Sequence, residues 1–166
     1  MEKTPGVVRK ELGLTETNER EYVPESDVTG VLLPSGWYMV FFNEPLPAEF
    51  DEATLSKLSQ GATVMLFVVE ETSMVSFARG YADGTRAWEV VHDANEGMEH
   101  LEVTGFPPPP FIEMRDRLLD ELSRSDQGAD FLFVLPAEFC KTTTGFRHDE
   151  DIEGIEGDAF AVLERS

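Results

Sequence analysis

The chain has 166 residues, which is the size of one ordinary domain and enough to bury a full hydrophobic core. It carries 33 acidic and 13 basic residues, and the formal net charge of −20 is spread along the whole sequence. Such a charge repels nucleic-acid phosphates and anionic lipid headgroups and attracts cationic partners, so we expect no nucleic acid and no membrane as partner. The hydrophobic content of 41% is too high for a disordered acidic chain, so the protein is expected to fold.

The sequence contains a single cysteine, Cys140, so no intramolecular disulfide can form. Its neighbours supply no motif that would activate a nucleophile, and the pattern favours a buried structural thiol. The first residues lack the apolar region of a signal peptide, and no apolar run approaches the ~18 residues of a membrane span. We therefore expect a cytoplasmic protein.

The first 29 residues are polar and charged, and residues 1–29 are predicted to be a mobile or surface-draped lead-in. The remainder, residues 30–166, is predicted to form a single domain. Its first strand is expected over residues 37–42, where aromatic and β-branched side chains alternate between two covered faces. A helix should follow, with Asp51 as its N-cap and Gly61 just beyond its last turn.

The middle of the chain has the pattern of antiparallel strands. Residues 62–71 are almost continuously apolar, which is typical of a central strand covered on both faces. Segments 73–81 and 85–93 alternate in polarity, and the Asp-Gly pair between them is a strong hairpin signal. A further short strand is expected over residues 100–104.

The last third of the chain begins with four prolines at 107–110, which predict a stiff extended connector. A helix is expected over residues 111–125, where apolar side chains recur every four residues. Residues 130–135 have the composition of a buried strand, and residues 136–145 that of a short helix or turn. A final strand is expected over residues 159–165.

Together these elements predict an α+β domain with a mostly antiparallel sheet of about five or six strands and two main helices on one face. The order of the elements resembles a ferredoxin-like layout with an added hairpin strand. No glycine-rich phosphate loop or other cofactor motif is present, so no cofactor is expected.

Histidines and carboxylates are concentrated in one stretch of nine residues. The candidate metal ligands there are His92, Asp93, Glu96, Glu99 and His100. Imidazole and carboxylate groups are good ligands for divalent transition metals, so a metal-dependent hydrolase is one hypothesis for the function. Their spacing matches no compact ligand signature, however, and one residue in five is acidic, so ordinary solvated loop residues are the competing interpretation.

Two segments, 44–52 and 149–158, are especially rich in carboxylates, and both are predicted to belong to an anionic docking surface. The residues expected to bind a partner there are Glu44, Glu49, Asp51, Glu52, Asp149, Glu150, Asp151 and Glu153. Glu21, Glu25 and Asp27 are expected to extend the second cluster. The segment 148–158 does not have the spacing of an EF-hand calcium loop.

Several segments carry a resemblance to other proteins. They are GWYMVFFN at 36–43, ADGTRAWEVVHD with HLEVTG between 82 and 105, and DFLFVLPAEF with TGFRHDE between 130 and 150. With them, most of residues 30–150 resembles a group of small, acidic, uncharacterised bacterial proteins. The resemblance implies a single bacterial cytoplasmic domain and carries no activity with it.

The absence of a specific catalytic motif, together with the charge, predicts a non-enzymatic binding protein. Its expected partner is a basic protein, and size and charge are similar to those of immunity-type inhibitors that mask basic toxins. The metal-dependent hydrolase is the alternative, and an acidity that serves solubility alone is a third interpretation. The sequence does not indicate an oligomeric state.

Overall fold

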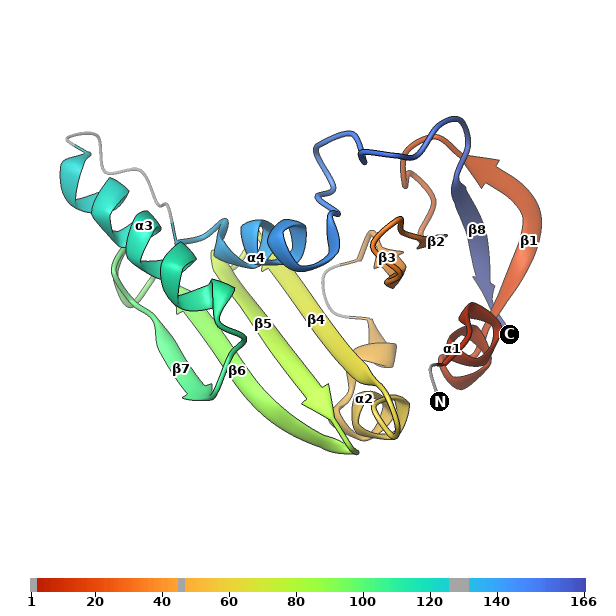
Figure 1. The fold of residues 1–166 in the computed structure, drawn as a ribbon, viewed down its shortest axis with the longest axis horizontal. Helices are drawn as coiled ribbons and strands as arrows, with labels where there is room; N and C mark the ends of the chain where they lie inside the picture. Colours follow the sequence, from red (N-terminus) through yellow and green to blue (C-terminus); the bar gives the residue numbers. More distant parts are fainter. Residues whose placement is uncertain (1–2, 45–46, 126–131) are drawn as a thin grey trace.

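The structure, a computed structural model, describes residues 3–44, 47–125 and 132–166. It contains two antiparallel four-stranded sheets that lie next to each other (Figure 1). The first sheet has the strand order β1 (Leu14–Glu21), β8 (Phe160–Arg165), β2 (Val28–Leu32) and β3 (Tyr38–Phe42). The second sheet has the order β4 (Thr63–Glu70), β5 (Val75–Ala82), β6 (Thr85–Asp93) and β7 (Glu102–Gly105). Figure 1 shows the edge strands β3 and β4 next to each other at the centre of the molecule.

Four α-helices and one short 3-10 helix surround the sheets. They are α1 (Pro5–Glu11), η1 (Ala48–Phe50), α2 (Glu52–Leu58), α3 (Pro110–Arg124) and α4 (Leu135–Thr144). Helix α2 begins where Asp51 accepts a hydrogen bond from the amide of Thr54, which confirms the predicted N-cap. Among the described residues, no helix has both the length and the apolar character that crossing a membrane requires.

The second sheet is covered on both faces. On one face, Trp88 and Val90 of β6 pack against Phe111 of α3 and Phe139 of α4. On the other face, Leu66 and Val68 of β4 and Tyr81 of β5 pack against Leu55 of α2. This two-sided covering explains why β4 is almost continuously apolar, because alternate side chains enter different cores.

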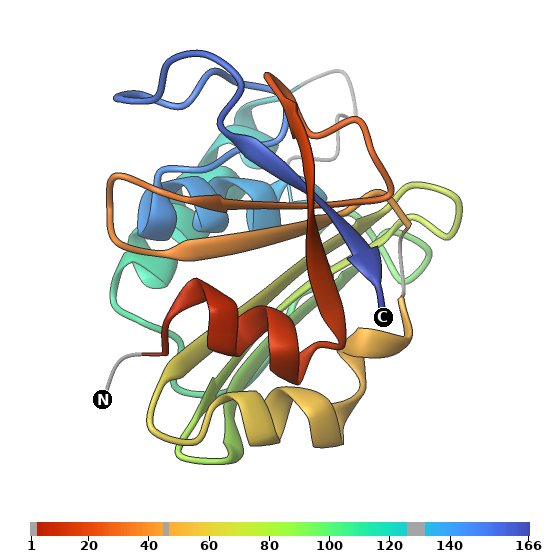
Figure 2. The ribbon, with the colours of Figure 1, turned by 90° about the vertical axis from the view of Figure 1, so that its right-hand side faces the viewer.

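The first sheet also has a core on each face. Val31, Leu33 and Phe160 face α4 together with Phe146, which follows that helix. Leu14, Val28, Ala161 and Leu163 form the core on the opposite face, where Leu12 packs directly after α1. Figure 2 shows α1 next to α2 below this sheet.

Helix α4 joins the two halves of the molecule, because neighbouring residues on it enter different cores. Phe139 is fully buried beside the second sheet, with ring centroids 5.4 Å from Trp88 and 5.9 Å from Phe67. The next residue, Cys140, is buried in the core of the first sheet beside Leu33 and Phe146. The hydroxyl of Ser35 ties the β2–β3 turn to α4 by donating to the carbonyl of Thr144 at 2.6 Å.

The α+β class is confirmed, but the predicted arrangement of the sheet is wrong. There are two sheets of four strands instead of one sheet of five or six, so the ferredoxin-like layout does not apply. The described residues form four α-helices instead of two main ones. The segment 62–71 is not a central strand: β4 lies at an edge of the second sheet, and its apolar sequence reflects the cores packed on both of its faces.

Two local predictions also need correction. The expected mobile lead-in at 1–29 forms α1, β1 and the start of β2 in its described part, because β1 pairs with β8 near the other end of the chain. The strand expected at 130–135 lies partly outside the described residues. Residues 132–134 form a bend and turn that lead into α4, so the short helix or turn expected over 136–145 is a helix.

Replacing Phe139 with alanine should destabilise the protein strongly. The ring is fully buried, so its loss leaves a cavity at the helix that connects the two cores, and the free energy of unfolding should fall by about 3–5 kcal/mol. Urea denaturation followed by circular dichroism measures the change. The matched control is Phe106→Ala, because Phe106 is 94% exposed and its loss should change stability by less than about 0.5 kcal/mol. Equal effects of the two substitutions would refute the role assigned to Phe139.

Candidate functional site

The acidic segment 44–52 is largely committed to contacts within the chain. Arg165 at the end of β8 donates to Glu49 at 2.6 Å and also pairs with Glu44. Hydrogen bonding to Arg165 is the main cause that lowers the pKa of Glu49. Asp51 caps α2, and Glu52 accepts a hydrogen bond from the Tyr81 hydroxyl at 3.0 Å. The Glu49–Arg165 pair thus links η1 to β8, and the Glu52–Tyr81 hydrogen bond links α2 to β5.

The acidic segment 149–158 follows α4 and is only partly paired. Arg147 donates to Asp149 at 2.6 Å, which lowers the pKa of that carboxyl, and Lys141 pairs with Glu150. Asp151 and Glu153 are exposed and have no cationic partner among the described residues. Their negative charge is therefore uncompensated.

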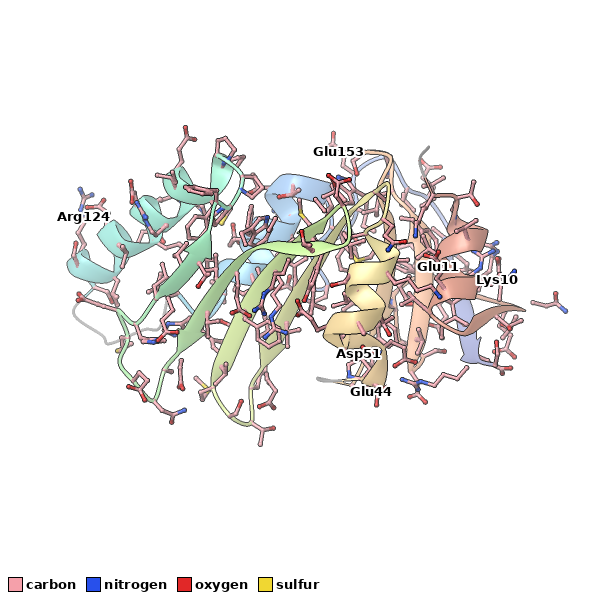
Figure 3. All side chains as sticks on the ribbon, turned by 90° about the horizontal axis from the view of Figure 1, so that it is seen from below. Lys10, Glu11, Glu44, Asp51, Arg124 and Glu153 are labelled. Carbon is pink, nitrogen blue, oxygen red and sulfur yellow. The ribbon has the colours of Figure 1, made fainter. Side chains whose placement is uncertain are left out.

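The two acidic segments do not form one continuous surface. In Figure 3, Glu153 lies near one long side of the molecule, and Glu44 and Asp51 lie near the other. The eight predicted binding residues are therefore divided between two places. Five of them already contact a cation, Asp51 serves as a helix cap, and only Asp151 and Glu153 remain without such a contact in the described structure.

Ion pairing inside the chain uses most of its cations. Eleven of the thirteen lysine and arginine side chains form ion pairs with carboxylates. They are Lys3, Arg9, Arg20, Arg79, Arg86, Arg115, Arg117, Arg124, Lys141, Arg147 and Arg165. The many remaining carboxylates therefore face solvent with few free cations near them, and the surface excess is strongly negative.

Part of the excess negative charge lies around the start of β8. Glu21 ends β1 directly opposite Phe160, and its carboxylate accepts hydrogen bonds from the Ser26 hydroxyl and from the amides of Glu25, at 2.8 Å, and Ser26, at 3.1 Å. Burial raises the pKa of Glu21, but these hydrogen bonds outweigh it and leave the pKa below its ordinary value. The amide of Glu25 donates to the Glu21 carboxylate, and Glu156 and Asp158 lie in the segment directly before β8; we call these four carboxylates the β8-start acids.

Asp27, which was expected to join this cluster, directly follows Ser26, whose amide and hydroxyl donate to Glu21. The carbonyl of Asp27 accepts a hydrogen bond from the amide of Asn43 at 2.9 Å, so it sits beside the end of β3. The segment 22–27 thus crosses from the end of β1 to the start of β2.

The candidate metal ligands form a hydrogen-bonded turn after β6. The Nδ1 atom of His92 lies 2.7 Å from the carbonyl oxygen of His100, and the amide of Asp93 donates to Nδ1 of His100 at 2.9 Å. His92 is almost fully buried. Because Nδ1 of His100 accepts the hydrogen bond from Asp93, a neutral His100 carries its proton on Nε2. This Nε2 atom lies 3.5 Å from Oε1 of Glu102.

The other members of this candidate set do not converge on the imidazoles. Asp93 accepts a hydrogen bond from the amide of Asn95 at 2.8 Å, and Glu96 and Glu99 are exposed. Within the described residues, no three His, Cys, Asp or Glu side chains come together in a group that could hold a metal ion. The visible role of the turn is to connect β6 to β7.

An elongated groove of about 780 Å³ lies between the two sheets. Strands β3 and β4 form its walls, α4 covers it on one side, and Leu12 and Leu58, from the region of α1 and α2, line the other side. Most lining side chains are apolar, and Phe41 and Phe67 are among them. A volume of this size is typical of ligand-binding clefts in proteins.

Sequence reasoning assigned these strands to the core and missed the groove. Each of the five residues of β3 is only half-buried, including Met39 and Phe41 on one face and Val40 and Phe42 on the other. An uncharged, aromatic strand is expected to be fully covered, and this one is not. The sequence signal was the lack of charge along both β3 and most of β4, which is unusual for strands at the edge of a sheet.

Cys140 lines the groove from α4, yet its thiol is almost inaccessible. Burial raises its pKa to about 11, and the contact with the Thr144 hydroxyl at 3.6 Å offsets this only in part. A nucleophile needs the opposite shift, so the geometry agrees with a structural thiol.

Comparison with known proteins adds no family or function to this geometry. No protein-family profile matches the chain, and neither the curated proteins nor the solved structures contain a significant match. The resemblance to small acidic bacterial proteins therefore stays a prediction.

The hydrogen bonds to Glu21 should make stability depend on pH. Because the pKa of folded Glu21 is lowered, its contribution is present above the ordinary pKa of 4.5 and is lost as the pH falls through the folded value. Glu21→Gln should cost about 1 kcal/mol at neutral pH and reduce the loss of stability on acidification. Urea denaturation across the acidic range measures this. Glu19→Gln, on the same strand, is the control, and an equal pH profile for both variants would contradict the assignment.

The Cys140 thiol should react slowly with DTNB while the protein is folded. Raising the pKa from 9.0 to about 11 lowers the thiolate fraction about 100-fold at pH 8, and burial slows the reaction further. The absorbance of the released thiol measures the rate, with the same protein in guanidinium chloride as control. Equal rates in the folded and denatured protein would show that the thiol is accessible.

Proposed function

We propose that this chain is a non-enzymatic binding protein whose anionic surface docks onto a basic partner protein. The observation that carries the proposal is the internal pairing of eleven of the thirteen cations, which leaves the excess carboxylates uncompensated at the surface. A surface of this kind raises the local concentration of cationic molecules and speeds their association.

The acids that are unpaired within the described structure are the best candidates for contact with the partner. Glu25, Glu156 and Asp158 of the β8-start acids are exposed, and Asp151 and Glu153 lie on the same connection between α4 and β8. Carboxylates that already hold Arg165 or Arg147 can contribute to the long-range field, but their loss would also disturb the fold. The proposed docking surface is therefore centred on the segment that leads into β8.

Immunity-type inhibitors are the class of binding protein that we propose for this chain. A small acidic domain that masks a basic, nucleic-acid-cleaving toxin needs fast association and no catalytic group, and both needs fit the charge distribution described above. We further propose the bacterial cytoplasm as its location, since an inhibitor of this kind acts where the toxin would otherwise cut.

Affinity capture from a bacterial lysate at two salt concentrations tests the docking. At about 50 mM NaCl the immobilised protein should retain a basic protein, and at about 500 mM screening should release it. The triple variant Glu25→Gln, Glu156→Gln, Asp158→Asn should retain about tenfold less, because each rim charge contributes up to about 1 kcal/mol.

The control for this capture removes the same charge elsewhere on the molecule. Glu113→Gln, Glu121→Gln and Asp83→Asn change α3 and the β5–β6 turn, and this variant should retain the partner at the wild-type level. Failure of the wild type to retain any basic protein at low salt, or equal losses for the two triple variants, would refute the proposal.

A further inference from the structure

The two outer edges of the sheets are protected against pairing with another strand. β1 carries Glu16, Glu19 and Arg20, and its register with β8 shifts between Glu16 and Arg20. β7 has only four residues and is followed by the prolines at 107–110. Charge, irregular register, short length and proline are the usual means by which proteins prevent edge-to-edge association.

The two inner edges have none of these protections. β3 is uncharged, and its five residues pair with β2 without a shift in register. β4 is eight residues long, pairs with β5 and with no other strand of the described residues, and has no charged residue before Glu70. Both strands face the same apolar groove, so the unprotected edges are confined to one place in the molecule.

The hydrogen-bonding pattern shows which amides of β3 face the groove. The amide of Leu33 donates to the carbonyl of Trp37 at 2.8 Å, and the amide of Asn43 donates to the carbonyl of Asp27 at 2.9 Å. Bonded pairs alternate along an antiparallel ladder, so residues 37, 39, 41 and 43 bond to the β2 side. The N–H and C=O groups of Tyr38, Val40 and Phe42 therefore point to the free edge, where no strand pairs with them in the described structure.

From these observations we infer that the groove binds an extended segment of the basic partner, which adds to β3 as an extra strand. The inference rests on the proposed function for the identity of the partner. Backbone hydrogen bonds to residues 38, 40 and 42 supply the register, and alternate side chains of the segment enter the apolar space between β3 and β4.

A hydrocarbon ligand fits the same volume but not the same chemistry. It would cover the free N–H and C=O groups of β3 without hydrogen bonds, and each buried unpaired group costs about 1–3 kcal/mol. A polypeptide backbone supplies the missing partners. A second copy of this chain is also disfavoured as the occupant, because two molecules that each carry a net charge of −20 repel one another.

The charge of the groove favours a segment with cations next to its apolar residues. Lys3 and Arg147 line the groove, but each is already paired, Lys3 with Glu11 at 2.6 Å and Arg147 with Asp149. Glu71, at the end of β4, is exposed and has no cationic partner in the described part of the chain. The uncompensated charge along the groove is thus negative, in agreement with a lysine- or arginine-flanked segment.

The probe is the acetylated and amidated heptapeptide Lys-Val-Thr-Val-Thr-Val-Lys, titrated by calorimetry into the wild-type protein. It should bind, and hydrogen exchange at the amides of Tyr38, Val40 and Phe42 should slow when it does. A version with N-methylated valines has the same charge and side chains but fewer donors. It should bind at least tenfold more weakly.

Val40→Pro tests the same edge from the side of the protein. It removes an amide that points away from β2, so the ladder with β2 is kept, and proline is tolerated on an edge strand. Ala137→Trp is a second variant, which fills the groove from α4 and leaves β3 unchanged. Each variant should lower the affinity for the heptapeptide at least tenfold, while circular dichroism confirms that both are folded.

Several outcomes would overturn the inference. They are no binding of the heptapeptide, equal binding by the N-methylated version or by folded Val40→Pro, displacement of the peptide by dodecanoate with no protection of the β3 amides, or a dimer that the peptide does not dissociate.

A heptapeptide with Glu in place of Lys separates the two proposals. If it binds equally well and remains sensitive to Val40→Pro, the strand site stands and the basic partner is refuted. Salt-sensitive binding of the lysine peptide that ignores Val40→Pro supports the anionic surface and refutes the strand site.

Discussion

The packing of α4 between the two sheets is the contact on which the rest of the structure depends. Phe139 and Cys140 are neighbours in sequence, yet one is buried with Trp88 and Phe111 and the other with Val31 and Leu33. A helix can do this because successive side chains point about 100° apart, so one turn can serve two cores. The sheets need no shared strand, and each keeps its own inner edge.

This arrangement leaves backbone hydrogen-bonding groups of β3 without a strand partner in the described residues. Two sheets that met edge to edge would satisfy every backbone group of β3 and β4, whereas a helical bridge leaves the outward amides of Tyr38, Val40 and Phe42 without a strand partner. A pre-formed groove with unused hydrogen-bonding groups is the structural basis for the peptide site that we infer.

The sequence predicts those turns and helix ends that depend on residues close together in the chain. The Asp-Gly hairpin between β5 and β6 and the Asp51 cap of α2 depend on residues within a few positions, and both were predicted. The pairing of β1 with β8 joins residues more than 130 positions apart, and nothing in the polar sequence of β1 announces its partner. For the same reason the apolar run of β4 was taken for a central strand. The apolar pattern shows that both faces of a strand are covered, but it does not show how many strands pair with its edges.

The acidity of the chain and its unprotected inner edges are connected by the same physics. An uncharged aromatic strand such as β3 is a site for pairing with identical molecules unless something keeps those molecules apart. The net charge of −20 acts between copies at a distance, while the pairing of most cations within the chain prevents attraction between copies. The same electrostatic field that repels a second copy attracts a cationic segment of a basic chain. Strand pairing at β3 then selects partners with an extended backbone, and the long-range field selects partners with a positive charge.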